Sequence, residues 1–219
     1  MRLVKLLGAV SVVACLAGFS ATAQEAAKEA EPVAPEQVVA EPAYIKGGIM
    51  HGSMDAPITI IEYASLTCPH CKQFSDEVTA VLEERLIPEG KVRLEFRHLI
   101  RDRLDMAVSV ALRCTGDVEV SKRLLKTFFN KQVAWMGSED PRTVITAIAA
   151  TEGVTEEDLN ACFVSKAVVQ HLLEMSQEGA ETYDISSTPT IIMDGKKMEY
   201  SSYAGLVRQI EAASLAAGQ

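Results

Sequence analysis

The stretch that decides the fold lies in the first third of the chain and joins a strand pattern to a pair of cysteines. It runs Ile58-Thr59-Ile60-Ile61-Glu62-Tyr63 and, after four further residues, Cys68-Pro69-His70-Cys71. The first part is rich in β-branched residues and follows a proline, so it predicts a buried strand. The second part carries a proline where a helix can begin at no cost, because the first N–H of a helix has no partner. The sequence therefore predicts a strand that leads into a helix with two cysteines at its start.

Two cysteines at this spacing are suited to reversible disulfide chemistry. Three residues along a helix place both sulfurs on one face, close enough to bond. The free amides and the positive dipole end stabilise a thiolate on Cys68, and thiols in such motifs have pKa values of roughly 3.5 to 7.5. We expect Cys68 to be the exposed nucleophile and Cys71 the buried resolving thiol. His70 would add a positive charge or a hydrogen-bond donor, unless it is an exposed spacer residue.

The spacing of hydrophobic residues after this stretch predicts further helices and strands, and together they indicate an α/β architecture. An apolar stripe from Phe74 to Leu86 predicts a helix, and the alternation over Val92–Phe96 predicts a half-buried strand. Helical patterns follow over about 102–183, including one segment from Val118 to Trp135. Later in the chain, a strand is predicted over Ile191–Met193, and Asp194-Gly195 predicts a hairpin turn to a partner strand over Lys196–Tyr200. The buried face of a closing helix is predicted at Leu206, Val207 and Ile210. The predicted order is βαβ, an all-helical block, then ββα.

Two further positions are candidates for the site. Thr188-Pro189 immediately precedes the Ile191 strand, and at that place relative to the cysteines we predict a cis bond. It would leave the Thr188 backbone free to pair with an extended substrate beside Cys68, although an ordinary strand-edge turn is the alternative. Glu62 lies in the predicted strand. It would relay protons to Cys71 or oppose thiolate formation if it is buried, and it would have neither role if it reaches solvent.

The beginning of the chain predicts export. Residues 1–23 have a basic start, an apolar run and a small-residue cleavage site at Ala21-Thr22-Ala23, which is the order of a secretory signal peptide. Cys15 lies in a sequence similar to a lipoprotein cleavage box, so lipid anchoring is an alternative. Residues 24–46 are rich in Ala, Glu and Pro and predict a flexible spacer before a single domain over 47–217. We therefore expect a periplasmic protein.

Export changes how the remaining cysteines are interpreted. Four cysteines in an oxidising compartment suggest two disulfides. The spacing favours a redox pair of Cys68 with Cys71 and a structural pair of Cys114 with Cys162. Two free buried thiols are the alternative for the second pair.

Composition and ligand spacing argue against other classes of function. The formal net charge is −9, so binding to nucleic acid is not expected, because it needs clustered Lys and Arg. Structural zinc needs two more ligands near the cysteine pair, whereas Cys114 and Cys162 are isolated and the histidines form no cluster. The sequence predicts neither a metal nor a cofactor.

The segment Asp55 to Tyr63 followed by Cys68-Pro69-His70-Cys71 closely resembles the DsbA-like thioredoxin family, over roughly Gly47 to Ala217. The resemblance implies a thioredoxin-like α/β fold with an inserted helical block. It also implies a monomeric protein disulfide oxidoreductase that donates the Cys68–Cys71 disulfide to exported cysteine-containing proteins during oxidative folding. A DsbB-like membrane quinone reductase would reoxidise it. Cys114 and Cys162 look like the extra pair of one bacterial DsbA-like subgroup, which implies a structural bridge.

Other functions stay open at this point. DsbA oxidases often have Val before the cis proline, whereas this chain has Thr188, as related isomerases and thioredoxins do. An isomerase or reductase is therefore the second hypothesis, although such isomerases carry an N-terminal dimerisation domain and the spacer here is short and polar. A non-catalytic anchored binding protein or holdase is the third, and its binding would survive alkylation of Cys68.

Overall fold

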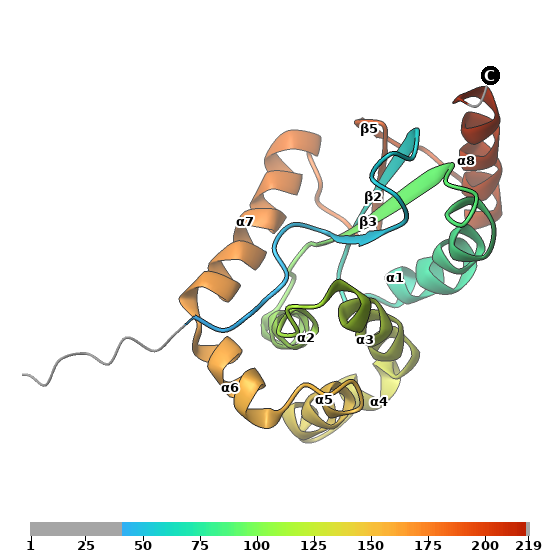
Figure 1. Cartoon of the computed structure of the whole chain (residues 1–219). Coiled ribbons are helices and arrows are strands. Elements are labelled where there is room, and N and C mark those ends of the chain that lie inside the picture. The colour runs from blue at the N-terminus through green and yellow to red at the C-terminus, as the bar shows by residue number, and fades with distance from the viewer. Residues whose placement is uncertain (1–40, 218–219) are drawn as a thin grey trace, which may run out of the picture. The chain divides into compact units, whose positions relative to one another are not determined.

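The structure is a computed structural model that describes residues 41–217 (Figure 1). It contains a five-stranded sheet in the order β1-β3-β2-β4-β5. The strands are β1 (Ile49–His51), β2 (Ile58–Ala64), β3 (Val92–His98), β4 (Thr190–Met193) and β5 (Lys196–Lys197). β2 and β3 pair in parallel, and the other three pairings are antiparallel. The predicted signal peptide, Cys15 and most of the predicted spacer lie outside the described residues.

The parallel pair is connected by the helix that carries the two cysteines. α1 (Pro69–Phe74) begins directly after Cys68 and continues as two π-helical segments, η1 (Ser75–Thr79) and η2 (Leu82–Leu86). β3 then returns beside β2, with Ile60 opposite Leu94 and Glu62 opposite Phe96. The expected βαβ unit, helical block and ββα unit are all present, which confirms the predicted thioredoxin-like α/β fold class.

The two faces of the sheet have different partners because side chains alternate along β2. Ile58 and Ile60 belong to one buried cluster with Phe74 of α1 and with Leu206 and Ile210 of α8 (Tyr203–Ala217). On the other face Tyr63 packs against α7, where a side chain at Gly179 would approach the Tyr63 ring to 2.5 Å. Alternation places Glu62 on the same face as Ile58 and Ile60, toward α1.

The helical block lies between β3 and β4 in the chain. Its helices are α2 (Arg103–Arg113), α3 (Val118–Asn130), α4 (Gln132–Met136), α5 (Pro141–Ala150), α6 (Glu156–Val164) and α7 (Lys166–Tyr183). Polar side chains cap the starts of all of them except α4, including Asp117 before α3 and a reciprocal capping box of Thr155 with Asp158 before α6. The core of the block extends to Cys68 and Cys71, so the cysteines lie where the block meets the sheet.

The predicted single helix over Val118–Trp135 is wrong in one respect. The chain leaves helical geometry at Lys131, which has φ −102° and ψ 13°, and α4 begins again at Gln132. Phe128 and Trp135 are buried on either side of the break, and the Trp135 indole donates to the Phe128 carbonyl at 2.8 Å. Apolar spacing therefore continues through the break and conceals it.

The edges of the domain also differ from the sequence prediction. The strand β1 was not predicted, because three residues are too few for a periodic signal. The last residues of the predicted spacer contact the domain rather than remaining separate: Ile45 is buried and its amide donates to the Arg113 carbonyl at 3.0 Å. The predicted partner strand over Lys196–Tyr200 is limited to β5, although the Met198 amide still donates to Ile191.

Candidate active site

Cys68 and Cys71 lie at the start of α1, as the sequence predicts. Cys68 is the N-cap residue with extended backbone angles, and its carbonyl accepts hydrogen bonds from the amides of Cys71 and Lys72 at 3.1 and 3.2 Å. Both cysteines are free thiols in the structure. Cys71 has no exposed surface, in agreement with the expectation that it is the inner thiol.

The expected exposure of Cys68 is wrong. The residue is only 5% exposed, because the segment before β4 lies against it. The Cys68 Sγ is 3.4 Å from the carbonyl oxygen of Thr188, to which the thiol form donates. The Thr188–Pro189 peptide bond is cis. The structure therefore brings the cysteine pair and the two predicted substrate-binding residues together, although they are 120 residues apart in the chain.

The two thiols have opposite acidities. A hydrogen bond from the Cys71 thiol, assisted by the Thr188 side chain and the amides of Cys71 and His70, lowers the pKa of Cys68 to about 5 despite burial. Burial raises the pKa of Cys71 far above its usual range, and the hydrogen bond to Cys68 and the charge of Glu62 raise it further. At neutral pH the reduced pair therefore holds a thiolate on Cys68 and a thiol on Cys71.

Glu62 is a buried acid on the α1 side of the sheet. The residue is 2% exposed, which decides against the solvent-reaching alternative, and its Oε1 has no hydrogen-bond partner among residues 41–217. Burial raises the pKa of Glu62 well above its usual value, and the negative charge on Cys68 adds to this effect. Glu62 therefore holds its proton more tightly than an exposed glutamate does, and it is electrostatically coupled to both cysteines.

Two residues that the sequence analysis did not identify hold the loop before Cys68. The Gln132 amide of α4 donates to the carbonyls of Leu66 and Cys68 at 2.7 and 3.0 Å. Asp105 of α2 has no exposed surface and accepts from the Leu66 amide at 2.9 Å. A polar residue within the apolar face of a helix is the only signal that Gln132 offers, and Asp105 resembles an ordinary residue of a helix start.

His70 is exposed at the first turn of α1. The Tyr203 hydroxyl at the start of α8 donates to the His70 carbonyl at 2.9 Å, so α8 as well as α4 holds the backbone around the cysteines. The His70 side chain borders a surface pocket of about 410 Å³ with Tyr200 and Tyr203. The structure thus places the backbone of His70 in the site, while the role of its imidazole stays a prediction.

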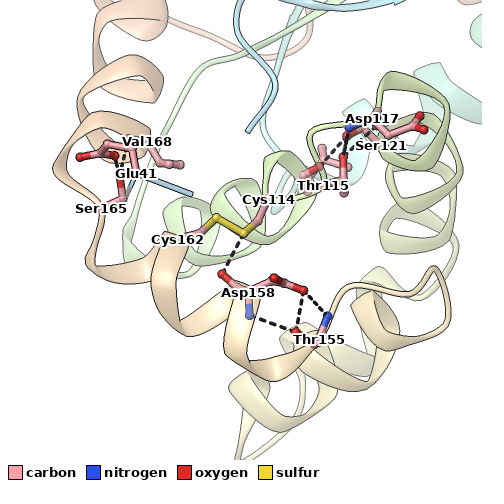
Figure 2. The surroundings of a disulfide bond; sticks show 11 residues. Glu41, Cys114, Thr115, Asp117, Ser121, Thr155, Asp158, Cys162, Ser165 and Val168 are labelled. Atoms are coloured by element: carbon pink, nitrogen blue, oxygen red, sulfur yellow. Dashed lines mark hydrogen bonds between the residues drawn. A yellow bond between two sulfur atoms is a disulfide. The ribbon is translucent and has the colours of Figure 1, made fainter. Parts of the chain in front are cut away.

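The second cysteine pair lies away from this site, within the helical block. Figure 2 shows Cys114, at the end of α2, joined by a disulfide to Cys162 of α6. The capping box of Thr155 and Asp158 stands beside the bond, and the Asp158 carbonyl oxygen is 3.0 Å from the Cys114 sulfur. Cys162 has no exposed surface. The position of the disulfide between two helices suits a structural bridge.

Over 41–217, no helix is both long enough and apolar enough to cross a membrane. The same residues contain no group of three His, Cys, Asp or Glu side chains arranged to hold a metal ion.

Comparisons with known proteins place this fold and site in a family. The sequence profile described as thioredoxin matches residues 45–212. The chain belongs to the thioredoxin family, in its DsbA-like branch, which confirms the predicted resemblance.

Individual relatives agree with this assignment. A protein of Rickettsia bellii named as a protein-disulfide oxidoreductase is 25% identical over 162 residues, covering 74% of this chain and 62% of the relative. The crystal structure of Wolbachia pipientis α-DsbA1 has a TM-score of 0.71 at 25% identity and covers 79% of this chain and 94% of that one. A protein-disulfide isomerase from Novosphingobium aromaticivorans has a TM-score of 0.68 at 25% identity, over 77% and 98%. The chain thus spans about three-fifths of the length of the first curated relative.

Proposed function

We propose that this protein is a thiol–disulfide oxidoreductase that donates the Cys68–Cys71 disulfide to cysteine-containing proteins. The observation that carries the proposal is the asymmetry of the pair: the pKa of Cys68 is lowered to about 5, whereas that of Cys71 is raised. A stable thiolate favours the reduced state of the enzyme, and an enzyme whose reduced state is favoured gives its disulfide away.

The stabilisation of the Cys68 thiolate is large enough to decide whether the enzyme donates or accepts a disulfide. With the Cys68 pKa at about 5, the thiolate stabilises the reduced state at pH 7 by about 3 kcal/mol relative to a free cysteine. For a two-electron couple this corresponds to roughly 60 mV toward oxidising potentials.

The proposed reaction has two exchange steps. A substrate thiolate attacks the Cys68 sulfur of the oxidised pair, the Cys68–Cys71 bond breaks, and Cys71 leaves with the electron pair and takes up a proton. A second substrate thiolate then attacks the substrate sulfur of the mixed disulfide and releases Cys68 as a thiolate. Two electrons pass from the substrate to the enzyme. Cys68 is the better leaving group in the second step because its pKa is low.

Glu62 and the segment before β4 have supporting roles in this proposal. The raised pKa of Glu62 favours the protonated form of a buried acid that is coupled to Cys71, which suits proton delivery to the departing thiolate. Among residues 41–217 the Thr188 amide has no hydrogen-bond acceptor, so it is free to pair with an extended substrate. Pro189 is the next residue and directly precedes β4.

The cellular setting of the proposal comes from the sequence. We infer a monomeric periplasmic protein that acts on exported proteins and is reoxidised by a DsbB-like membrane quinone reductase. The signal peptide pattern in residues 1–23 supports the location. Thr188 in place of Val favours a second candidate function, a reductase or isomerase with the same residues.

The equilibrium of the Cys68–Cys71 pair with reduced and oxidised glutathione tests the direction of transfer. The mature protein with its Cys114–Cys162 disulfide intact is the sample. We expect a potential far more oxidising than about −270 mV, the value for thioredoxin. A potential near that value would contradict the oxidase and favour the reductase. Absence of any exchange would contradict both functions.

A further inference from the structure

An arginine that the mechanism does not use stands at the rim of the active site. The Arg101 Nη1 is 3.4 Å from the Thr188 hydroxyl, and the Thr188 carbonyl oxygen is 3.4 Å from the Cys68 sulfur. Arg101 is exposed, whereas Cys68 is buried. One residue therefore separates a solvent-facing guanidinium from the reactive sulfur, at the edge where we propose that the substrate pairs.

The backbone holds Arg101 at this place. Asp105, which is fully buried, accepts from the Arg101 amide at 3.1 Å through Oδ2 and from the Leu66 amide at 2.9 Å through Oδ1. One carboxylate thus fixes both the segment that carries Arg101 and the loop that leads to Cys68. The position of the arginine relative to the sulfur is part of the architecture of the site.

The charge of Arg101 is not used inside the described domain. Within residues 41–217 no carboxylate oxygen lies within 4.0 Å of its guanidinium, whereas Arg97 and Arg123 are both in ion pairs. The whole chain carries a formal net charge of −9, so the charge of Arg101 beside the reactive sulfur is opposite in sign to that of the chain. A guanidinium binds carboxylates well because its donors match their geometry.

We propose that Arg101 determines substrate specificity by binding the carboxylate of an Asp or Glu residue that flanks the reacting cysteine of the substrate. The inference rests on the proposed exchange at Cys68 with the substrate beside Thr188. It does not depend on the direction of transfer. An acidic flank gains an ion pair in the mixed disulfide, while a basic flank meets a like charge.

Three reporter peptides that differ only in the residues flanking one cysteine pair test this role, with Glu, Gln or Lys at the flanks. The measured quantity is the ratio of kcat/KM values for exchange between the Glu and Gln peptides. For the wild type we expect a ratio of about two to five, the range that an exposed ion pair supplies, and a decrease toward one as salt rises. Arg101→Gln should bring the ratio to about one, Arg101→Lys should retain part of it, and Arg101→Glu should favour the Lys peptide.

The ratio separates specificity from a merely structural role. A variant that only disturbs the loop or the Cys68 thiolate slows all peptides alike and leaves the ratio unchanged. Arg103→Gln is the matched control, since Arg103 is also exposed and lies two residues further along. Equal ratios for the wild type and Arg101→Gln would overturn the inference. Failure of every peptide to exchange with the wild type would instead overturn the proposed function.

Discussion

Cys68 ionises readily because several hydrogen-bond donors converge on its sulfur, and the thiol of Cys71 is the strongest of them. Hydrogen bonds to charged groups contribute about 1.5–3 kcal/mol, which corresponds to one to two pH units. We therefore expect the Cys68 pKa to rise by about one to two units in Cys71→Ala. Thiolate absorbance or the rate of alkylation against pH measures it. Cys71→Ser keeps a hydroxyl donor and should stay closer to the reduced wild type. An unchanged Cys68 pKa in Cys71→Ala would mean that the amides at the start of the helix stabilise the thiolate without the Cys71 thiol.

The same thiolate makes the stability of the reduced protein depend on pH. The folded pKa of Cys68 is about 5 and the unfolded value about 8.5, so the stabilisation is fully present above pH 8.5 and disappears as pH falls to 5. Between pH 8 and pH 5 the reduced protein should lose about 3 to 4 kcal/mol of unfolding free energy relative to the oxidised protein. Urea unfolding of both forms at the two pH values measures this. Parallel pH profiles would show that the thiolate contributes no stability.

The helical block takes part in the active site through α2 and α4, whose side chains reach the loop before Cys68. Gln132 of α4 is the clearest case, because among residues 41–217 its amide is the sole donor to the Leu66 carbonyl. The residue is 3% exposed, so no water is at hand to replace it. The insertion therefore fixes the shape of the redox loop in addition to covering it.

Gln132→Leu should accordingly destabilise the protein. The substitution leaves a buried carbonyl without a donor, which costs about 1–3 kcal/mol of unfolding free energy. Val133→Ala is the matched control on the same helix: Val133 is 83% exposed and its truncation should change stability by less than about 0.5 kcal/mol. Urea unfolding of the two variants makes the comparison. Equal stability would show that the loop does not depend on this contact.

For the molecule as a whole, the sequence predicts what depends on neighbouring residues and fails where contacts span long distances. β2, α1 and β3 follow from periodicity and from Pro69, since burial of each element leaves a repeating pattern. Gln132 and Asp105 were missed because their partners lie 66 and 39 residues away. The burial of Cys68 was missed for the same reason: Thr188, which covers it, is 120 residues away.

The Cys114–Cys162 disulfide spans two helices of the insertion, with a sequence separation of 48, and lies apart from the residues around Cys68. In the chain-entropy model a bridge over this separation stabilises the fold by about 4 kcal/mol, through restriction of the unfolded chain. The double variant Cys114→Ala/Cys162→Ala should therefore lose several kcal/mol of unfolding free energy in urea. The glutathione equilibrium of Cys68–Cys71 should stay the same, because no group that sets the Cys68 pKa belongs to this pair. A shift of that equilibrium in the folded variant would mean that the bridge tunes the redox site through the helices that hold its loop.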